Sequence, residues 1–81
     1  MTIQVHFYSF FREKTGCSDT SVEVGPGTTL GDLVALIHQR FPALHPFDRS
    51  TLLAVGVDYQ QRSYLLREGD VVSFFPPVQG G

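Results

Sequence analysis

Hydrophobic and polar positions alternate over the first residues of the chain. Between residues 2 and 8, every second side chain is a bulky apolar one, and the next alternating run spans residues 20–24. A period of two is typical of a β-strand with one buried face. The spacing of the two runs predicts a hairpin with a longer loop, and residues 9–17 of that loop can hold a short helical turn before Gly16.

A period close to four follows the hairpin and predicts the main helix. Thr29 is a suitable N-cap, and Asp32 three residues later completes a short-armed capping box. Pro42 ends the helix, because the residue before a proline is disfavoured in the α region. The apolar stripe at helical spacing consists of Leu30, Leu33, Val34, Ile37 and Phe41.

The second half of the chain returns to extended patterns. Residues 42–50 contain two prolines and are expected to form a loop, whereas residues 52–57 are apolar and predict a strand. Residues 64–66 suggest another short extended piece. Residues 67–70 resemble a turn ahead of a last strand over residues 71–75.

This order of elements predicts an α+β fold. We expect a ubiquitin-like β-grasp: a mixed sheet with one main helix packed across one face, and the first and last strands as central parallel neighbours. A small antiparallel sheet with a different strand order is the alternative. We expect a β-grasp domain over residues 1–75, followed by an extended tail over residues 76–81.

Composition narrows the class of protein. The chain has 81 residues, 42% of them hydrophobic, and a net charge of −2 without a basic cluster. Nucleic acid and anionic membranes are therefore not the expected partners. There is no apolar run near 18 residues and no basic N-terminal segment, and Cys17 is the only cysteine. A cytoplasmic location is the expectation that follows.

The end of the chain is its most informative segment. Pro76 and Pro77 stiffen the base of a run that reaches at most about 20 Å, and Gly80 and Gly81 make its tip narrow. Such a tail can carry its carboxylate into another protein's active site. Because an ionised carboxylate is a poor electrophile, it needs activation, for example by AMP transfer from ATP. A frayed terminus that ends in two glycines is the alternative.

Candidate surface residues flank this tail. If Ile3, Val5 and Phe7 face the helix, Tyr8 faces away, as does Phe75 on the neighbouring strand. The two rings would then form an exposed aromatic patch at the base of the tail, a feature typical of partner sites.

Other reactive side chains are less informative. Cys17 has no neighbouring cation in the sequence and is interpreted as an incidental thiol. The three histidines show no metal-ligand spacing, and His38 is expected on the exposed side of the helix. Arg12, close to the base of the tail, could steer an acidic partner, although a solvated arginine is the simpler interpretation.

Two segments resemble a known family. Residues 3–13 and the ending Phe-Phe-Pro-Pro-Val-Gln-Gly-Gly are similar to the MoaD/ThiS sulfur-carrier family, and most similar to its MoaD type, the small subunit of molybdopterin synthase. Thiamine-type ThiS carriers usually lack the double proline. Members often carry an asparagine in the strand that resembles residues 54–57, where this chain has Gly56 and Val57, so a local turn or contact there can differ.

The resemblance implies a function. A MoeB-like enzyme would adenylate Gly81 with ATP, and a sulfur donor protein would convert it to a thiocarboxylate. Gly80 would provide clearance inside a MoaE-like large subunit, where the sulfur passes to cyclic pyranopterin monophosphate. The chain itself would bind no cofactor and catalyse nothing alone. The residues expected to dock on partners are Tyr8, Phe75, Pro76, Pro77 and Val78.

Three other functions remain open at this stage. A ThiS-like carrier would supply sulfur for the thiazole of thiamine, and a ubiquitin-like modifier would form isopeptides with lysines. A simple binding module would not need a free terminus.

Overall fold

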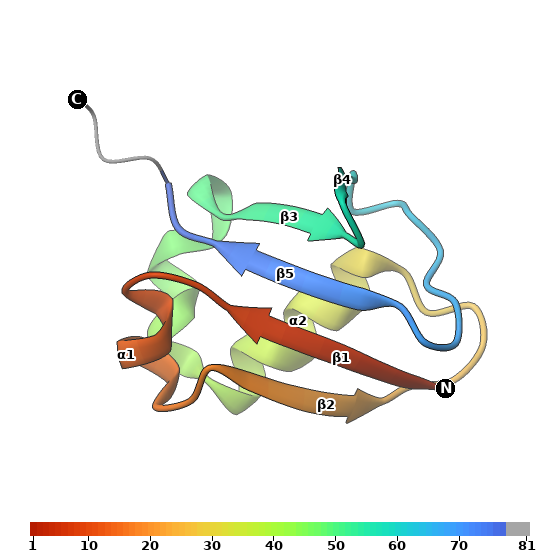
Figure 1. Cartoon of the computed structure of the whole chain (residues 1–81), viewed down its shortest axis with the longest axis horizontal. Coiled ribbons are helices and arrows are strands. Elements are labelled where there is room, and N and C mark those ends of the chain that lie inside the picture. The colour runs from red at the N-terminus through yellow and green to blue at the C-terminus, as the bar shows by residue number, and fades with distance from the viewer. Residues whose placement is uncertain (78–81) are drawn as a thin grey trace.

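The computed structural model describes residues 1–77 and contains a five-stranded mixed sheet (Figure 1). The strands lie in the order β2-β1-β5-β3-β4, and α2 crosses one face. Within the described residues, no helix combines the length and apolarity needed to cross a membrane. The elements are β1 (Thr2–Phe7), α1 (Phe11–Thr15), β2 (Asp19–Glu23), α2 (Leu30–Arg40), η1 (Pro42–Ser50), β3 (Leu52–Val55), β4 (Asp58–Tyr59) and β5 (Val71–Phe75).

Parallel pairing of the first and last strands forms the centre of the sheet. The register of β1 with β5 runs from Gln4 opposite Val71 to Phe7 opposite Phe74. β2 pairs antiparallel with β1, and β3 pairs antiparallel with β5. This topology confirms the predicted ubiquitin-like β-grasp and excludes the all-antiparallel alternative.

The main helix forms as its sequence predicts. The Thr29 side chain accepts a hydrogen bond from the Asp32 amide at 3.1 Å, and the Asp32 carboxylate accepts one from the Thr29 amide at 3.0 Å. This reciprocal pair satisfies two amides that the first helical turn would otherwise leave unpaired. The buried side of α2 packs on β1 and β5, and the core cluster includes Ile3, Val5, Phe7, Leu30, Leu33, Val34, Ile37, Val72 and Phe74.

The prediction of a loop over residues 42–50 was wrong, because this segment is a 3₁₀ helix, η1. Pro42 occupies the first turn, where the missing amide has no partner to lose. Leu44 is buried and ties the segment to the core. A 3₁₀ helix has three residues per turn, so its side chains do not repeat every 3.6 residues. The apolar pattern of this segment therefore did not indicate a helix.

The short extended piece predicted at residues 64–66 is present as an antiparallel bridge between Leu65 and Thr29. The prediction missed the two-residue strand β4, which lies at Asp58–Tyr59. The strand predicted over residues 52–57 ends at Val55, because Gly56 has a φ of +61° and turns the chain into β4. The departure from the family pattern at Gly56 therefore coincides with a tight turn.

His38 does not lie on an exposed face, because η1 covers that side of α2. Its side chain is 10% exposed, and its Nδ1 is 3.7 Å from Asp48 Oδ1. Arg62 binds the same carboxylate at 2.9 Å, and within residues 1–77 the buried Nε2 of His38 has no hydrogen-bond partner. Burial lowers the pKa of His38; Asp48 raises it in part, and His45 and Arg62 lower it further.

We expect stability to fall as the pH drops below about 6.5, the usual histidine value. The unfolded chain then takes up a proton that the folded His38 resists, so acid favours unfolding until the lowered folded-state pKa is passed. Urea unfolding at several pH values between 7.5 and 5 would measure this loss. A His38→Gln variant should show a flatter dependence, and an equal slope in both proteins would contradict the assignment.

Candidate functional site

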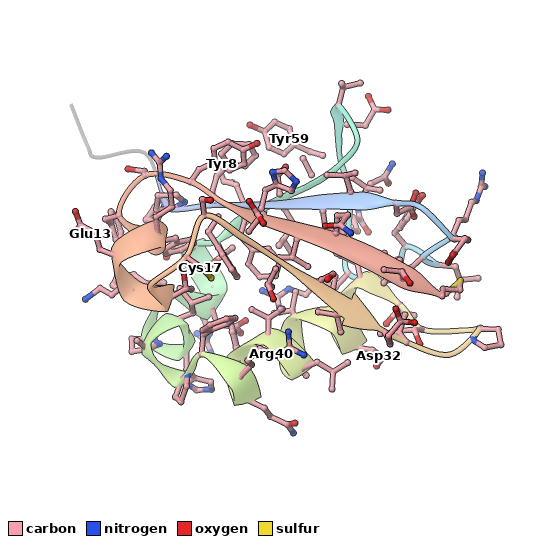
Figure 2. All side chains as sticks on the ribbon, turned by 60° about the horizontal axis from the view of Figure 1, so that its bottom comes forward. Tyr8, Glu13, Cys17, Asp32, Arg40 and Tyr59 are labelled. Carbon is pink, nitrogen blue, oxygen red and sulfur yellow. The ribbon has the colours of Figure 1, made fainter. Side chains whose placement is uncertain are left out.

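Two aromatic rings meet where β5 ends. The rings of Tyr8 and Phe75 are stacked, with centroids 4.5 Å apart and an interplanar angle of 16°. Parallel pairing of their strands brings them together, and the Tyr8 amide extends the ladder by donating to the Phe74 carbonyl at 3.2 Å. The predicted aromatic patch is therefore present, on the face of the sheet opposite α2 (Figure 2).

The stacked pair forms part of a hollow of about 330 Å³ at the base of the tail. Its wall is mostly apolar, and the first two residues beyond β5 contribute to it, both of them half-buried. The chain therefore leaves the sheet along this hollow. The lining residues are Tyr8, Ser9, Phe10, Leu52, Tyr59, Phe75, Pro76 and Pro77.

Sequence reasoning missed the side of the hollow built by β3 and β4. Leu52 lies opposite Phe75 in the ladder, and Tyr59 lies opposite Ala54 one strand further out. Figure 2 shows the side chains of Tyr8 and Tyr59 on the same face. Leu52, an apolar residue at the start of a predicted strand, was the one possible sign of this wall in the sequence. Its position opposite Phe75 depends on the pairing register, which alternation within a single strand does not reveal.

The turn after β1 shapes the other side of the hollow. Ser9 has a φ of +55°, the left-handed region that residues other than glycine seldom adopt. Its carbonyl accepts from the Arg12 amide at 3.1 Å, so the strained residue also starts α1. The turn places Phe10 against Phe11 and Phe47, with centroids 5.3 Å apart in each pair.

The outward face of the central strands follows the predicted alternation, with one refinement. Ser73 points outward but is only 7% exposed. In the register it lies between His6 on β1 and Ala54 on β3. A short side chain in the middle of a sheet is shielded by its neighbours, so Ser73 is buried although it points outward.

The arrangement is suited to docking another protein. The hollow is lined by aromatic, aliphatic and proline side chains, and its polar groups are hydroxyls. Among residues 1–77, no three histidine, cysteine, aspartate or glutamate side chains are placed to hold a metal ion. An apolar hollow with stacked rings is typical of an anchor site for another protein.

The remaining predicted residues do not line the hollow or lie outside the described residues. Cys17 is half-buried beside the core, 3.7 Å from the Thr15 hydroxyl. Arg12 is exposed on α1. Val78, Gly80 and Gly81 lie outside the described residues, so the roles predicted for them stay predictions, as does the domain boundary after residue 75.

The sequence is similar to curated sulfur-carrier subunits over its whole length. It is 32% identical to the molybdopterin synthase sulfur carrier subunit of Chlamydomonas reinhardtii, over 100% of both chains. It is 34% identical to the subunit of the same name from Mycobacterium tuberculosis, over 98% of this chain and 99% of the relative.

Solved structures share the fold. A putative molybdopterin converting factor subunit 1 from Pyrococcus furiosus is 27% identical, with a TM-score of 0.88 over 96% of this chain and 99% of that one. A subunit from the complex of subunits 1 and 2 of the Helicobacter pylori molybdopterin-converting factor is 24% identical, with a TM-score of 0.72 over 100% of both chains. The ThiS family model matches residues 5–81. The chain therefore belongs to the MoaD/ThiS family of β-grasp proteins.

Proposed function

We propose that this chain is the sulfur-carrier subunit of a molybdopterin synthase, and that the terminal carboxyl group of Gly81 is loaded with sulfur. The main support is the apolar hollow at the root of a tail that ends in Gly80 and Gly81. The names of relatives that match over the full length support the same role.

The chemistry begins at the terminal carboxylate. One of its oxygens attacks the α-phosphorus of ATP on an activating enzyme, which releases pyrophosphate and forms an acyl-adenylate. A persulfide on a donor protein then attacks the acyl carbon and AMP leaves, which gives an acyl disulfide. A second thiol attacks the donor's sulfur, so that the S–S bond breaks, the donor ends in a disulfide with that thiol, and the outer sulfur stays on the acyl carbon. The product is a thiocarboxylate on Gly81. ATP is consumed by the partner, so the carrier itself needs no bound cofactor.

The loaded tail then transfers sulfur inside a MoaE-like large subunit. The Helicobacter pylori structure is a complex of subunits 1 and 2 of a molybdopterin-converting factor, which supports a partner subunit here. The hollow around Tyr8 and Phe75 docks the carrier, and Pro76 and Pro77 direct the tail away from the sheet. The large subunit supplies the acid and base groups that act on cyclic pyranopterin monophosphate.

We expect intact mass spectrometry to detect the loaded state. After incubation with the cognate activating enzyme, ATP and a sulfur donor, the mass should rise by the difference between a sulfur and an oxygen atom. A variant with one alanine added after Gly81 should show no change, because its carboxylate then belongs to a residue with a Cβ, which does not fit the narrow active site. Equal loading of both proteins would contradict the role of Gly81.

A second readout separates the molybdopterin role from the alternatives. The thiocarboxylated protein should convert cyclic pyranopterin monophosphate to molybdopterin when it is mixed with the large subunit. Loading without this conversion, together with sulfur transfer into a thiazole, would favour the thiamine-type carrier. Covalent conjugates to lysines in cell extracts would favour a protein modifier.

We expect Tyr8→Ala to weaken binding to the large subunit by about 2 kcal/mol, roughly 30-fold in Kd, because it removes an aromatic anchor. Leu36→Ala is the matched control, since Leu36 is 40% exposed and Tyr8 38%, but Leu36 lies on α2. Isothermal titration would measure both affinities, with thermal melting to verify folding. Equal losses in the two variants would show that the hollow does not dock the partner.

A further inference from the structure

The charged side chains of this chain are divided between the two ends of the sheet. At the end where β5 finishes, the exposed cations are Arg12 and Lys14 on α1 and Arg49 near the end of η1. The opposite end carries one arginine, Arg67, and most of the carboxylates of the chain. These carboxylates are Glu23, Asp32, Asp58, Glu68 and Asp70.

Strand register places the acidic group. Glu23 lies opposite Thr2, and Glu68 accepts a hydrogen bond from the Thr2 amide at 2.8 Å. Asp58 lies opposite Val55, at the far end of β3. Asp32 caps the first turn of α2, and Figure 2 shows it at the end of the molecule opposite α1. Glu23, Asp32 and Glu68 are therefore remote from the hollow, whereas Asp58 directly precedes Tyr59 in the wall of the hollow.

The cations lie on segments next to those that line the hollow. Arg12 and Lys14 follow the turn that lines the hollow, and Arg49 lies three residues before Leu52, which pairs with Phe75. Figure 1 shows α1 at the end of the sheet where β5 finishes. We call Arg12, Lys14 and Arg49 the basic rim.

Local contacts account for only one member of the basic rim, Lys14. Within residues 1–77, the only carboxylate in an ion pair is that of Asp48, which contacts Arg62 and His38. Lys14 lies over the Phe47 ring at 5.7 Å, and the one carboxylate among the residues of α1 is Glu13. Arg40 differs, because it donates to Thr20 and Ser21 on the edge strand and so has a local partner.

Glu13 on α1 and Asp19, which pairs with His6, also lie toward the tail end, so that end carries charges of both signs. The opposite end holds five carboxylates and one arginine, so the protein is still an electric dipole whose less negative end is at the tail. The net charge is −2, so an acidic surface repels the molecule as a whole and attracts only the end that bears the basic rim. A field of this kind orients a protein before contact and raises the rate of productive encounter. The same field disfavours approach by the acidic end, which could not deliver the tail.

We propose that the basic rim docks on an acidic surface around the tail-binding cleft of the activating enzyme, and that it acts mainly on the association rate. This inference rests on the proposed carrier function. The activating enzyme must bind and release a carrier in every loading cycle, so its complex gains from fast association without tight binding. Exposed rim charges have this effect, because they change association more than dissociation.

The test uses charge reversals at the two ends. Arg12→Glu and Arg49→Glu should each lower the adenylation rate at limiting carrier by about fivefold at low ionic strength. Arg67→Glu changes the net charge by the same amount at the acidic end and should change the rate less than about twofold. ATP–pyrophosphate exchange measures the rate, and melting curves verify that each variant is folded.

Salt and a conservative variant sharpen the test. At about 0.5 M salt the differences among the variants should disappear, because exposed charges are then screened. Arg12→Lys should keep the wild-type rate, since a positive charge and not a particular geometry is required. Binding of the carrier to the large subunit provides a comparison. The rim variants should slow this association less than they slow adenylation.

Several results would overturn the proposal. They are equal slowing by Arg67→Glu, slowing that persists at high salt, or a loss confined to the large subunit. Failure of the wild-type protein to be adenylated at all would instead contradict the proposed function, so the two hypotheses fail in different ways.

Discussion

The parallel ladder between β1 and β5 is the interaction on which the rest of the structure depends. It joins residues about 67 positions apart in the chain, from Gln4 and Val71 to Phe7 and Phe74. One side of this pair carries the inner surface that α2 covers. The other side brings Tyr8 and Phe75 together, so the same ladder builds the core and positions the base of the tail.

Much of this arrangement could be predicted from the sequence, because it depends on long periodic segments and on local capping. The alternation in β1, the stripe on α2 and the Thr29–Asp32 box all act within a few residues of one another. The stacking of Tyr8 on Phe75 followed once the two strands were taken as parallel neighbours. The errors occurred where tertiary contacts decide: β4 has two residues, too few to show a period, and η1 buries His38 without an apolar pattern of its own.

The candidate site was predicted only in part for a related reason. Tyr8 and Phe75 lie on central strands, whose facing is determined by their own alternation. Leu52 and Tyr59 reach the hollow only through the registers of β3 with β5 and of β4 with β3. A shift of one residue would turn these side chains to the other face, and no pattern within such short segments specifies that register.

The hollow and the basic rim serve different stages of a protein encounter. An apolar hollow acts only at contact distance, because its contribution comes from removing apolar surface from water. Charges on the rim act over about 10 Å at moderate ionic strength, before any water is displaced. Phe10 and Leu52 line the hollow, Arg12 follows Phe10 by two residues, and Arg49 precedes Leu52 by three. One end of the fold therefore combines long-range orientation with short-range anchoring. A carrier that uses one tail for two partners can thereby share the anchor and still differ in how fast each partner captures it.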